Sequence, residues 1–402
     1  MFDLRRFINK SVTFRDDSLF KDDINNHQEE LYKKIYNKRV LVIGGAGSIG
    51  SSYIKAILPY EPKDLVVVDI NENALAELTR DLRSTSGLYV PQNYITYPMS
   101  FSSYVFKKML INNGGFDIIA NFSAHKHVRS EKDIFSIEAL LRNNVIDVKY
   151  FLELLKEYPP EEYFCVSTDK AANPVNIMGA SKRIMEDLVF SYSQYFPVKT
   201  ARFANVAFSN GSLPAGFLAR IAKQQPLSAP ADVKRYFVSP EESGQICMLA
   251  CMLGNNREIF FPKLSKEQMI SFDFIATEVL HSYGYNVLQC NSDSEARQKA
   301  TELLQGSREY PVYYSHSDTS GEKSFEEFFT EDETVDMDRM KNLGVIVNKV
   351  IPGRKVVDSF LEKLESVLNS NEASKESIVD VMKEYLPNFN HIEKGKSLDS
   401  KM

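Results

Sequence analysis

The sequence is poor in features that mark secreted, membrane-spanning or metal-rich proteins. It has four cysteines and six histidines among 402 residues, and their spacing matches no metal motif. We therefore expect no metal site, and we expect free thiols in a reducing compartment. No run of 18 apolar residues is present, which argues against a membrane span. The first six residues lack the apolar core of a signal peptide, so we predict a cytoplasmic protein.

The charge balance excludes a further class of partner. The net charge of −6 gives no electrostatic reason to expect binding to nucleic acid or to an anionic membrane. A hydrophobic content of 43% and a charged content of 25% are typical of a globular protein. The length allows a large core and more than one domain.

A glycine motif is the clearest feature that is present. The apolar run 39–44 leads into Gly44-Gly-Ala-Gly47-Ser48-Ile49-Gly50. A strand, a glycine turn and a helix start in this order form a site for the phosphates of a dinucleotide. A second apolar run, 65–69, ends in Asp69, where a carboxylate is expected to bind the adenosine ribose.

The residues after Asp69 bear on the choice of cofactor. They are Ile70, Asn71 and Glu72, so no adjacent arginine is available for a 2′-phosphate. We therefore predict NAD, with Asn71 among its contacts. Arg80 and Arg83 on the next predicted helix leave NADP as the less favoured alternative.

Strand-like and helical runs alternate from residue 38 to about residue 205. This alternation predicts a Rossmann-like, doubly wound parallel sheet covered by helices on both faces. We expect strands at 39–44, 65–69, 116–121, 163–167 and 199–205, with helices near 51–58, 72–83, 103–112, 135–158 and 180–195.

The predicted organisation has four parts. An N-terminal helical extension covers 1–36, and an NAD-binding domain covers 37–206 with return elements at 238–262. A smaller α/β substrate domain takes 207–237 and 263–350, and a helical tail takes 351–402. Within these parts we expect a loop-rich segment at 208–235, a helix at 240–253 with Ser239 as its N-cap, a strand at 259–261 and a helix at 375–385.

The most specific motif follows the predicted strand 163–167. It begins Ser167-Thr168-Asp169-Lys170 and continues through Asn176 to Met178-Gly-Ala-Ser-Lys182-Arg183. An acid and a base therefore stand side by side at the carboxyl end of a strand, where ligands bind in such sheets. Met178 and Lys182 lie one helical turn apart and share a helix face. Methionine cannot transfer a proton, so another group must do so here.

This motif resembles that of the nucleotide-sugar 4,6-dehydratases of bacterial polysaccharide biosynthesis, which are extended short-chain dehydrogenases/reductases. It looks like the UDP-N-acetylglucosamine branch, in which methionine replaces the tyrosine of a Tyr-x-x-x-Lys pair. Further motifs support the resemblance: Ser123–Val128, Arg202–Val206, Ser209–Ser212, Arg235–Phe237, Gly321–Lys323 and Glu326-Glu327. The sequence departs from the family pattern at Arg129, at Thr319-Ser320 and at Pro98-Met99-Ser100.

The resemblance implies a reaction and a set of roles. UDP-N-acetylglucosamine would lose water to give UDP-2-acetamido-2,6-dideoxy-4-keto-hexose. Lys170 would act as base at C5, Asp169 as acid at the C6 hydroxyl and Thr168 as a partner of the C4 hydroxyl, while Lys182 would bind the nicotinamide ribose. Burial should favour neutral Lys170 and protonated Asp169. We also expect Ser123 and Ala124 at the cofactor, and Lys126, His127, Asn205, Ser212, Arg235 and Glu322 at the substrate.

Several alternatives stay open at this point. Retention of configuration at C5 is argued from Met178, because the inverting branch keeps tyrosine. A C5-inverting 4,6-dehydratase, a nucleotide-sugar epimerase and a non-catalytic NAD-binding protein are the other hypotheses. The epimerase would have no use for Asp169 and Lys170. Membrane-bound members carry transmembrane helices ahead of this domain, so the polar 36-residue start suggests a soluble, shortened form. The helices near 135–158 and 180–195 predict a homodimer or a higher homo-oligomer.

Overall fold

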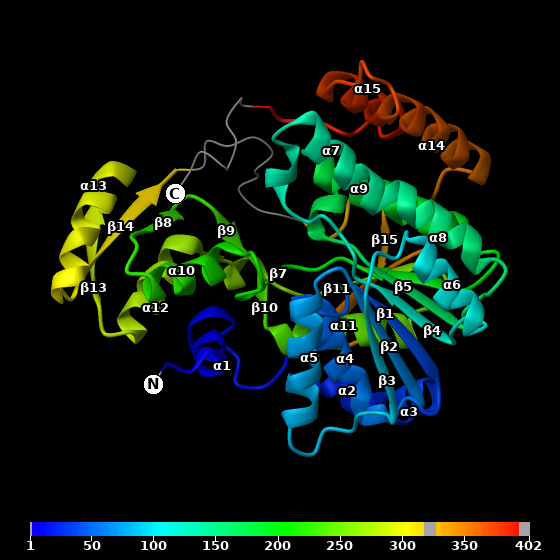
Figure 1. The fold of residues 1–402 in the computed structure, drawn as a ribbon, viewed down its shortest axis with the longest axis horizontal. Helices are drawn as coiled ribbons and strands as arrows, with labels where there is room; N and C mark the ends of the chain where they lie inside the picture. The colour runs from blue at the N-terminus through cyan, green and yellow to red at the C-terminus, as the bar shows by residue number, and fades with distance from the viewer. Residues whose placement is uncertain (1, 317–326, 394–402) are drawn as a thin grey trace.

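A computed structural model of the chain describes residues 2–316 and 327–393 (Figure 1). Its main element is a nine-stranded sheet with the order β15-β16-β11-β6-β5-β4-β1-β2-β3. The strands are β1 (Arg39–Ile43), β2 (Asp64–Asp69), β3 (Asn93–Pro98), β4 (Ile118–Asn121), β5 (Glu162–Val166), β6 (Val198–Ala201), β11 (Glu258–Pro262), β15 (Thr334–Asp336) and β16 (Leu343–Val347). The first seven pair in parallel, and β15 and β16 add an antiparallel edge.

The central strands are rich in β-branched and other apolar residues because both faces of the sheet are covered. Every residue of β4 and β5 is buried, as are all residues of β1 after Arg39. Helices α4 (Ser48–Ile57) and α11 (Pro240–Leu253) lie on one side of the sheet, and α7 (Ile134–Leu141), α8 (Asp147–Leu155) and α9 (Ile177–Ser191) lie on the other (Figure 1). The prediction of a Rossmann-like, doubly wound sheet is confirmed.

Strand order determines where a ligand site can form. The chain runs from β1 outward to β2 and β3, then returns to β4 on the other side of β1. In the register of the sheet, Ile43 of β1 pairs with Val68 of β2 and with Asn121 of β4. The carboxyl ends of these strands therefore meet at a topological switch point, which is where open α/β sheets bind ligands.

A smaller α/β unit stands beside the main sheet (Figure 1). It contains the parallel strands β8 (Leu227–Pro230), β13 (Asn286–Cys290) and β14 (Glu309–Ser315) in the order β13-β14-β8. Its own apolar core includes residues of α10 (Leu213–Ala222) and α12 (Phe272–Ser282). Two short strand pairs, β7 (Asn205–Val206) with β10 (Phe237–Val238) and β9 (Lys234–Arg235) with β12 (Ile270–Ser271), belong to the same part of the chain.

Three boundaries differ from the predicted ones. Strands β15 and β16 join the main sheet, although we expected all of 263–350 in the smaller unit. Strand β3 was absent from the predicted set, because its Asn-Tyr-Ile-Thr-Tyr-Pro sequence is polar and it lies at an edge. Helix α10 lies inside the segment that we expected to be loop-rich. The antiparallel pairing of β15 and β16 depends on contacts between distant segments, whereas the Ser212 cap of α10 is a local contact with the nitrogen of Ala215 that the prediction overlooked.

The N-terminal 36 residues are divided between the two cores. Phe7, Ile8 and Val12, from α1 (Leu4–Phe7) and the turn after it, pack in the core of the smaller unit. Leu31 and Ile35 of α3 (Gln28–Ile35) pack in the core of the main sheet. The predicted helical extension therefore contributes to both parts of the molecule.

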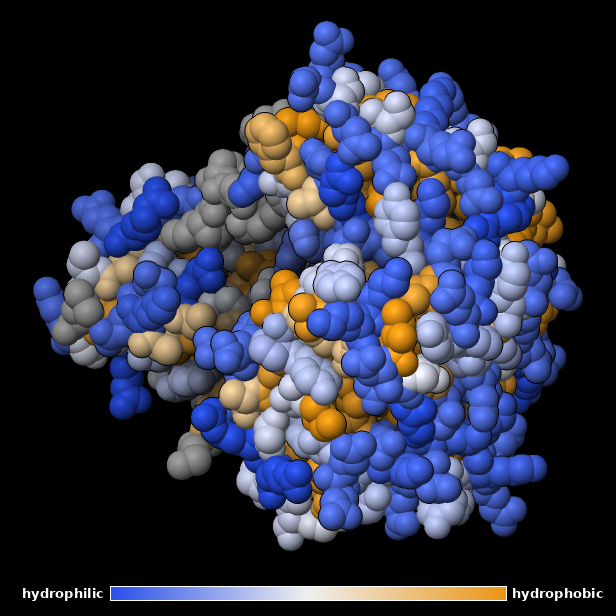
Figure 2. All heavy atoms as spheres, turned by 45° about the vertical axis from the view of Figure 1, so that its right-hand side comes forward, coloured by the Kyte–Doolittle hydropathy of each residue, from blue (hydrophilic) through white to orange (hydrophobic). Residues whose placement is uncertain are grey.

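Two C-terminal helices cover the outer side of α8 and α9 (Figure 1). They are α14 (Arg354–Leu368) and α15 (Lys375–Tyr385), which pack together through the stacked rings of Phe360 and Tyr385, with centroids 4.2 Å apart. Arg354 reaches Glu153 of α8 at 2.7 Å. On the face shown in Figure 2, apolar residues are scattered among hydrophilic ones.

This arrangement bears on the predicted homodimer. Within α9 every residue except Arg183 is buried inside the single chain. The helix 177–191 therefore has no free face for a second copy, contrary to our expectation for the predicted helix at 180–195. A homo-oligomer stays a prediction, but α9 cannot form its interface in this arrangement. Among the described residues, none of the helices is long and apolar enough to cross a membrane.

Candidate active site

The glycine motif forms a close turn between β1 and α4. Gly44 adopts a φ of +70°, and a Cβ there would lie 2.7 Å from the backbone nitrogen of Ser123. A Cβ on Gly50 would lie 2.4 Å from the carbonyl oxygen of Gly44, so only glycine lets α4 start this close to the strand. Gly47 is the N-cap, and no side chain caps the first turn of α4. The backbone N–H groups of Ser48 and Ile49, in the first turn of α4, lie at the positive end of the helix dipole.

Asp69 lies at the end of β2 and supports this turn. Its Oδ2 accepts a hydrogen bond from the backbone nitrogen of Ala46 at 3.0 Å, and its Oδ1 accepts one from that of Asn71 at 3.0 Å. The Asn71 side chain caps α5 (Glu72–Ser84) by accepting from the nitrogen of Ala74. The carboxylate is therefore placed at the switch point, as the sequence predicts, while the Asn71 side chain has a structural partner of its own.

The segment after β4 carries the next predicted residues. Ser123 Oγ donates to Asn143 at 3.2 Å. Ala124 follows it and is half-buried. The buried Asn144 accepts from the backbone nitrogen of His125 at 2.9 Å and donates to Ser181 of α9 at 3.1 Å.

Asn143 and Asn144 were not among the predicted site residues. They lie in a π-helical turn, Arg142–Ile146, that joins α7 to α8. Such turns often occur at functional sites. The available signal was a pair of asparagines inside an otherwise apolar helical run.

Thr168, Asp169 and Lys170 follow β5 at the carboxyl edge of the sheet. Lys170 Nζ lies 3.1 Å from Asp169 Oδ1, and the same oxygen accepts from Thr168 Oγ1 at 2.8 Å and from the Lys170 backbone nitrogen at 2.9 Å. The Asp169 side chain is 4% exposed and that of Lys170 is 19% exposed. We call Asp169 and Lys170 the edge pair. The structure brings this acid and base into contact, as predicted, and they form an ion pair.

Helix α9 starts beside the edge pair and carries Met178 and Lys182. Asn176 caps the helix by accepting from the backbone nitrogen of Gly179 at 2.7 Å. Lys182 is buried, and its Nζ donates to the Val166 carbonyl at the end of β5 at 2.9 Å. Burial lowers the pKa of Lys182 to about 8. Met178 is also buried and offers no proton to a substrate.

Contacts between the main sheet and the smaller unit connect several predicted substrate residues. The backbone nitrogen of Asn210 donates to Ser48 Oγ at 2.9 Å, and Lys126 Nζ donates to the Asn210 carbonyl at 3.1 Å. A Cβ on Gly211 would lie 3.0 Å from His127 Nε2. Lys126 and His127 therefore meet the 209–212 motif beside the glycine turn.

The other predicted substrate residues have more varied surroundings. Asn205 is half-buried on β7, and its backbone nitrogen donates to the carbonyl of Tyr236, the residue after Arg235, at 3.1 Å. Arg235 is 7% exposed and donates to the Lys234 carbonyl at 2.9 Å. Ser212 is the N-cap of α10. Glu322 lies outside the described residues.

A group of buried charges behind the edge pair was also missed. Ser167 Oγ donates to Glu186 of α9 at 2.6 Å. Glu186 pairs with Arg202 at 2.7 Å and with Lys349 at 2.8 Å, and Arg202 pairs with Glu333 at 2.7 Å. We call Glu186, Arg202, Glu333 and Lys349 the buried network. It joins β5, α9 and β6 to two distant segments, which local sequence patterns cannot show.

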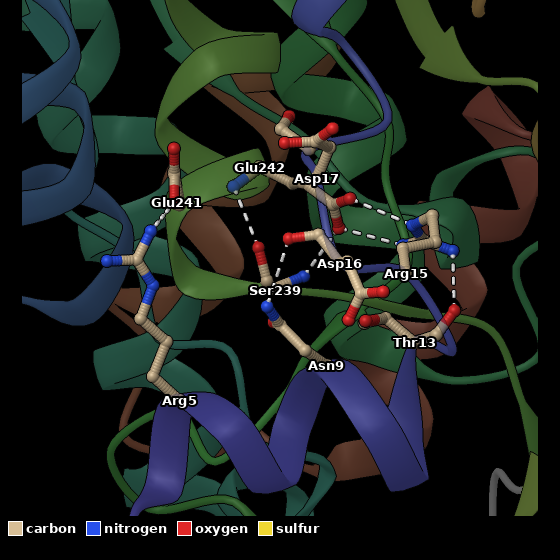
Figure 3. A pocket seen from close by; sticks show the side chains of 10 residues that line it. Arg5, Asn9, Thr13, Arg15, Asp16, Asp17, Ser239, Glu241 and Glu242 are labelled. Carbon is tan, nitrogen blue, oxygen red and sulfur yellow. Dashed lines mark hydrogen bonds and ion pairs between the residues drawn. The ribbon is translucent and has the colours of Figure 1, made fainter.

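A polar cavity near the N-terminus is lined by none of the predicted site residues. This cavity of about 80 Å³ is lined by the N-terminal segment and the first turn of α11, and it is crossed by the Arg5–Glu241 and Arg15–Glu242 ion pairs (Figure 3). Across 2–316 and 327–393, no group of three or more metal-ligating side chains is placed to hold an ion. The four cysteines are buried and free.

Known proteins resemble the chain over most of its length. The family model described as "Polysaccharide biosynthesis protein" matches residues 40–347. An uncharacterized membrane protein of Methanocaldococcus jannaschii is 29% identical, over 87% of this chain and 96% of that protein. A "UDP-N-acetylglucosamine 4,6-dehydratase (inverting)" of Campylobacter jejuni is 22% identical, over 86% of this chain and 97% of that protein. The X-ray structure of Pen from Bacillus thuringiensis shares the fold, with a TM-score of 0.63 at 20% identity, over 78% of this chain and 87% of that chain.

Proposed function

The chain belongs to the polysaccharide biosynthesis protein family, and from that premise we propose that it is an NAD-dependent nucleotide-sugar 4,6-dehydratase. We propose UDP-N-acetylglucosamine as its substrate and UDP-2-acetamido-2,6-dideoxy-4-keto-hexose, with the C5 configuration retained, as its product. The observation that carries this proposal is the edge pair, an acid and a base in contact at the carboxyl edge of the sheet.

The glycine turn supports a dinucleotide cofactor. The close approach at Gly44 and Gly50 leaves a backbone cradle that any Cβ would fill, and the first turn of α4 faces it without a side-chain cap. We propose that this turn holds the pyrophosphate, that Asp69 holds the adenosine ribose and that Lys182 holds the nicotinamide ribose. A bound NAD would supply the hydride acceptor for C4 and the hydride donor for C6, without net redox change, and the proton of the C4 hydroxyl would leave to water.

The edge pair supports the elimination step. Loss of water needs a base for the C5 proton and an acid for the departing C6 hydroxyl. We assign Lys170 Nζ to take the proton and Asp169 to give one, so that the hydroxyl leaves as water. We assign Thr168 to hydrogen-bond the C4 hydroxyl. For this role the Thr168 hydroxyl would have to give up its contact with Asp169 and turn to the substrate.

The ion pair seen between these groups is compatible with those roles. Charged Lys170 with charged Asp169 carries the same total number of protons as neutral Lys170 with protonated Asp169. One proton moved along the 3.1 Å contact converts the first form into the second. A substrate that covers the pair removes it from water, and desolvation favours the form without charges.

Turnover of UDP-N-acetylglucosamine in D2O, followed by NMR, tests the proposal. A C6 methyl doublet that collapses to a singlet as C5 takes up deuterium, with a 4-keto hydrate and glucosamine-type ring couplings, is the expected result. Lys170→Met is the negative control. An unchanged sugar in the presence of NAD-loaded protein would contradict the proposal.

The C5-inverting dehydratase is the second candidate. The similarity to the inverting enzyme of Campylobacter jejuni favours it, and Met178 favours retention. The same spectra separate the two reactions, because inversion at C5 changes the ring couplings. An epimerase would give no C6 methyl signal, only the N-acetyl methyl that the substrate already has.

A further inference from the structure

The chain after α15 returns to the carboxyl edge of the sheet. The backbone nitrogen of Ile392 donates to the carbonyl of Val175 at 3.0 Å. Val175 lies between the edge pair and Asn176, the N-cap of α9. A residue near the end of the described chain therefore contacts the loop that separates the two groups of predicted catalytic residues. We call residues 386–393 the C-terminal segment and residues 172–176 the site loop.

A second contact involves the start of α9. Glu131 Oε1 accepts from the backbone nitrogen of Met178 at 2.9 Å, which satisfies a donor in the first turn of the helix. Its other oxygen lies 3.7 Å from His391 Nε2 of the C-terminal segment, and both side chains are nearly buried. Lys375 of α15 approaches the Glu131 carbonyl at 3.5 Å and also pairs with Glu393. The C-terminal segment thus touches the residue that fixes the position of Met178.

The site loop has no strand pairing of its own, and it is held by the burial of Ala172, Pro174 and Asn176 together with these contacts. It follows a short turn, Asp169–Ala171, and precedes α9. Asn173 of the loop also donates to Glu327 at 2.9 Å. A loop held by a few side-chain and backbone bonds moves when one of them is lost.

The C-terminal segment is anchored independently of the site loop. Phe389 is 2% exposed and packs in the core of the main sheet. Its backbone nitrogen donates to the Leu386 carbonyl at 2.9 Å. Behind it, α15 is stacked on α14, and Arg354 ties α14 to Glu153 and Tyr192. Residues 391 and 392 are therefore presented to the site by a packed support.

We propose that the C-terminal segment positions the site loop, with His391 and Ile392 as positioning residues that hold Asp169 and Lys170 in register with Met178 and Lys182. The inference rests on the proposed function of the same site. Neither residue touches substrate in this proposal; both act through Val175 and Glu131. Loss of the segment misplaces the edge pair relative to the start of α9.

Two shortened chains test the proposal. One ends at Asn390, which keeps Phe389 and removes His391, Ile392 and Glu393. The matched control ends at Glu393 and keeps every contact described above. We expect kcat of the first to fall about 10- to 100-fold, because small misplacements of catalytic groups have effects of that size. KM, NAD affinity and the melting temperature should stay close to those of the control.

A single substitution isolates the backbone contact. Ile392→Pro removes the backbone N–H that donates to the Val175 carbonyl, and Ile392→Val keeps it. The proline variant should lose turnover while the valine variant keeps it. Hydrogen exchange over residues 171–178 should be faster in the chain ending at Asn390 and in Ile392→Pro than in their controls.

The outcomes separate the positioning role from the catalytic proposal. If the full chain converts no nucleotide sugar, the proposed function is wrong, and hydrogen exchange still decides whether the segment holds the loop. Unchanged exchange in the chain ending at Asn390 would overturn the inference, as would full kcat in that chain. A kcat loss matched by equal losses of NAD binding and thermal stability would also overturn it, because the segment would then be a general structural support.

Discussion

Two neighbouring turns of helix α9 bury opposite charges with opposite results. Lys182 and Glu186 are 4% and 0% exposed. The Lys182 ammonium is hydrogen-bonded by the Val166 carbonyl and the Met185 thioether, neither of which is charged, and burial lowers its pKa to about 8. Burial alone would raise the pKa of Glu186, but Arg202 and Lys349 hold it well below its usual value.

The difference shows that burial by itself does not decide how a charged group behaves. A buried charge with matched partners keeps its charge, whereas one with only dipoles for partners gains or loses its proton more easily. Glu186 therefore belongs to a fixed structural network, while the proton of Lys182 is exchangeable near neutral pH. Perturbed groups of the second kind are typical of functional sites.

The largest effect should come from removing the base of the edge pair. In Lys170→Met we expect turnover to fall by about 10²- to 10⁴-fold, the usual contribution of a general acid or base. The free energy of unfolding should fall by about 1–3 kcal/mol, because the buried Asp169 carboxylate loses one donor and keeps those of Thr168 Oγ1 and the backbone nitrogen of residue 170. NMR of product formation and urea unfolding measure the two quantities. Turnover within tenfold of wild type would show that Lys170 is not the base.

The buried network should show the reverse pattern. Arg202→Met leaves Glu186 and Glu333 short of a partner, and breaking a buried ion pair in this way costs about 3–5 kcal/mol. Arg183→Met is the matched control, because Arg183 reaches Glu333 from a more exposed position on the same network. It should cost about 1 kcal/mol. If the two variants lost the same free energy of unfolding, the distinction between the buried network and the more exposed Arg183 would be contradicted.

Features made by neighbouring residues could be predicted from the sequence, and features made by distant segments could not. Local patterns were enough to predict the glycine turn and helices α11 and α15, whose predicted bounds match the structure. This is because a helix cap and the periodicity of apolar residues depend only on residues that are close in the sequence. The edge pair was predicted from its place after the strand 163–167 and from the resemblance of that motif to a known family. The buried network was not, since Glu186 in an amphipathic run looks like a solvated residue until Arg202, Glu333 and Lys349 are brought to it by the fold. The pairing of β15 and β16 was missed for the same reason.

A smaller, pH-dependent effect should come from Lys182. Its folded-state pKa of about 8 lies below the ordinary value of 10.5, so the unfolded chain binds more protons between these two values. The free energy of unfolding of the wild type should therefore rise with pH across this window, relative to Lys182→Met. The rise is at most about 3.5 kcal/mol, since each unit of pKa difference is worth about 1.4 kcal/mol. Urea unfolding of both proteins at pH 8 and 10.5 measures it, and a constant difference would contradict the lowered pKa.

The smallest effects should appear at the N-terminal cavity, where two arginines of one segment face neighbouring glutamates (Figure 3). The Arg5 and Glu241 side chains are 81% and 53% exposed, whereas those of Arg15 and Glu242 are 15% and 2% exposed. Arg15 binds both oxygens of Glu242, at 2.9 and 2.8 Å. Arg15→Ala should cost about 1–3 kcal/mol, because it leaves a buried carboxylate with fewer donors. Arg5→Ala should cost less than about 0.5 kcal/mol, since water replaces the arginine. Urea unfolding of the two variants under one condition compares them, and similar costs would mean that exposure does not separate structural from incidental ion pairs in this protein.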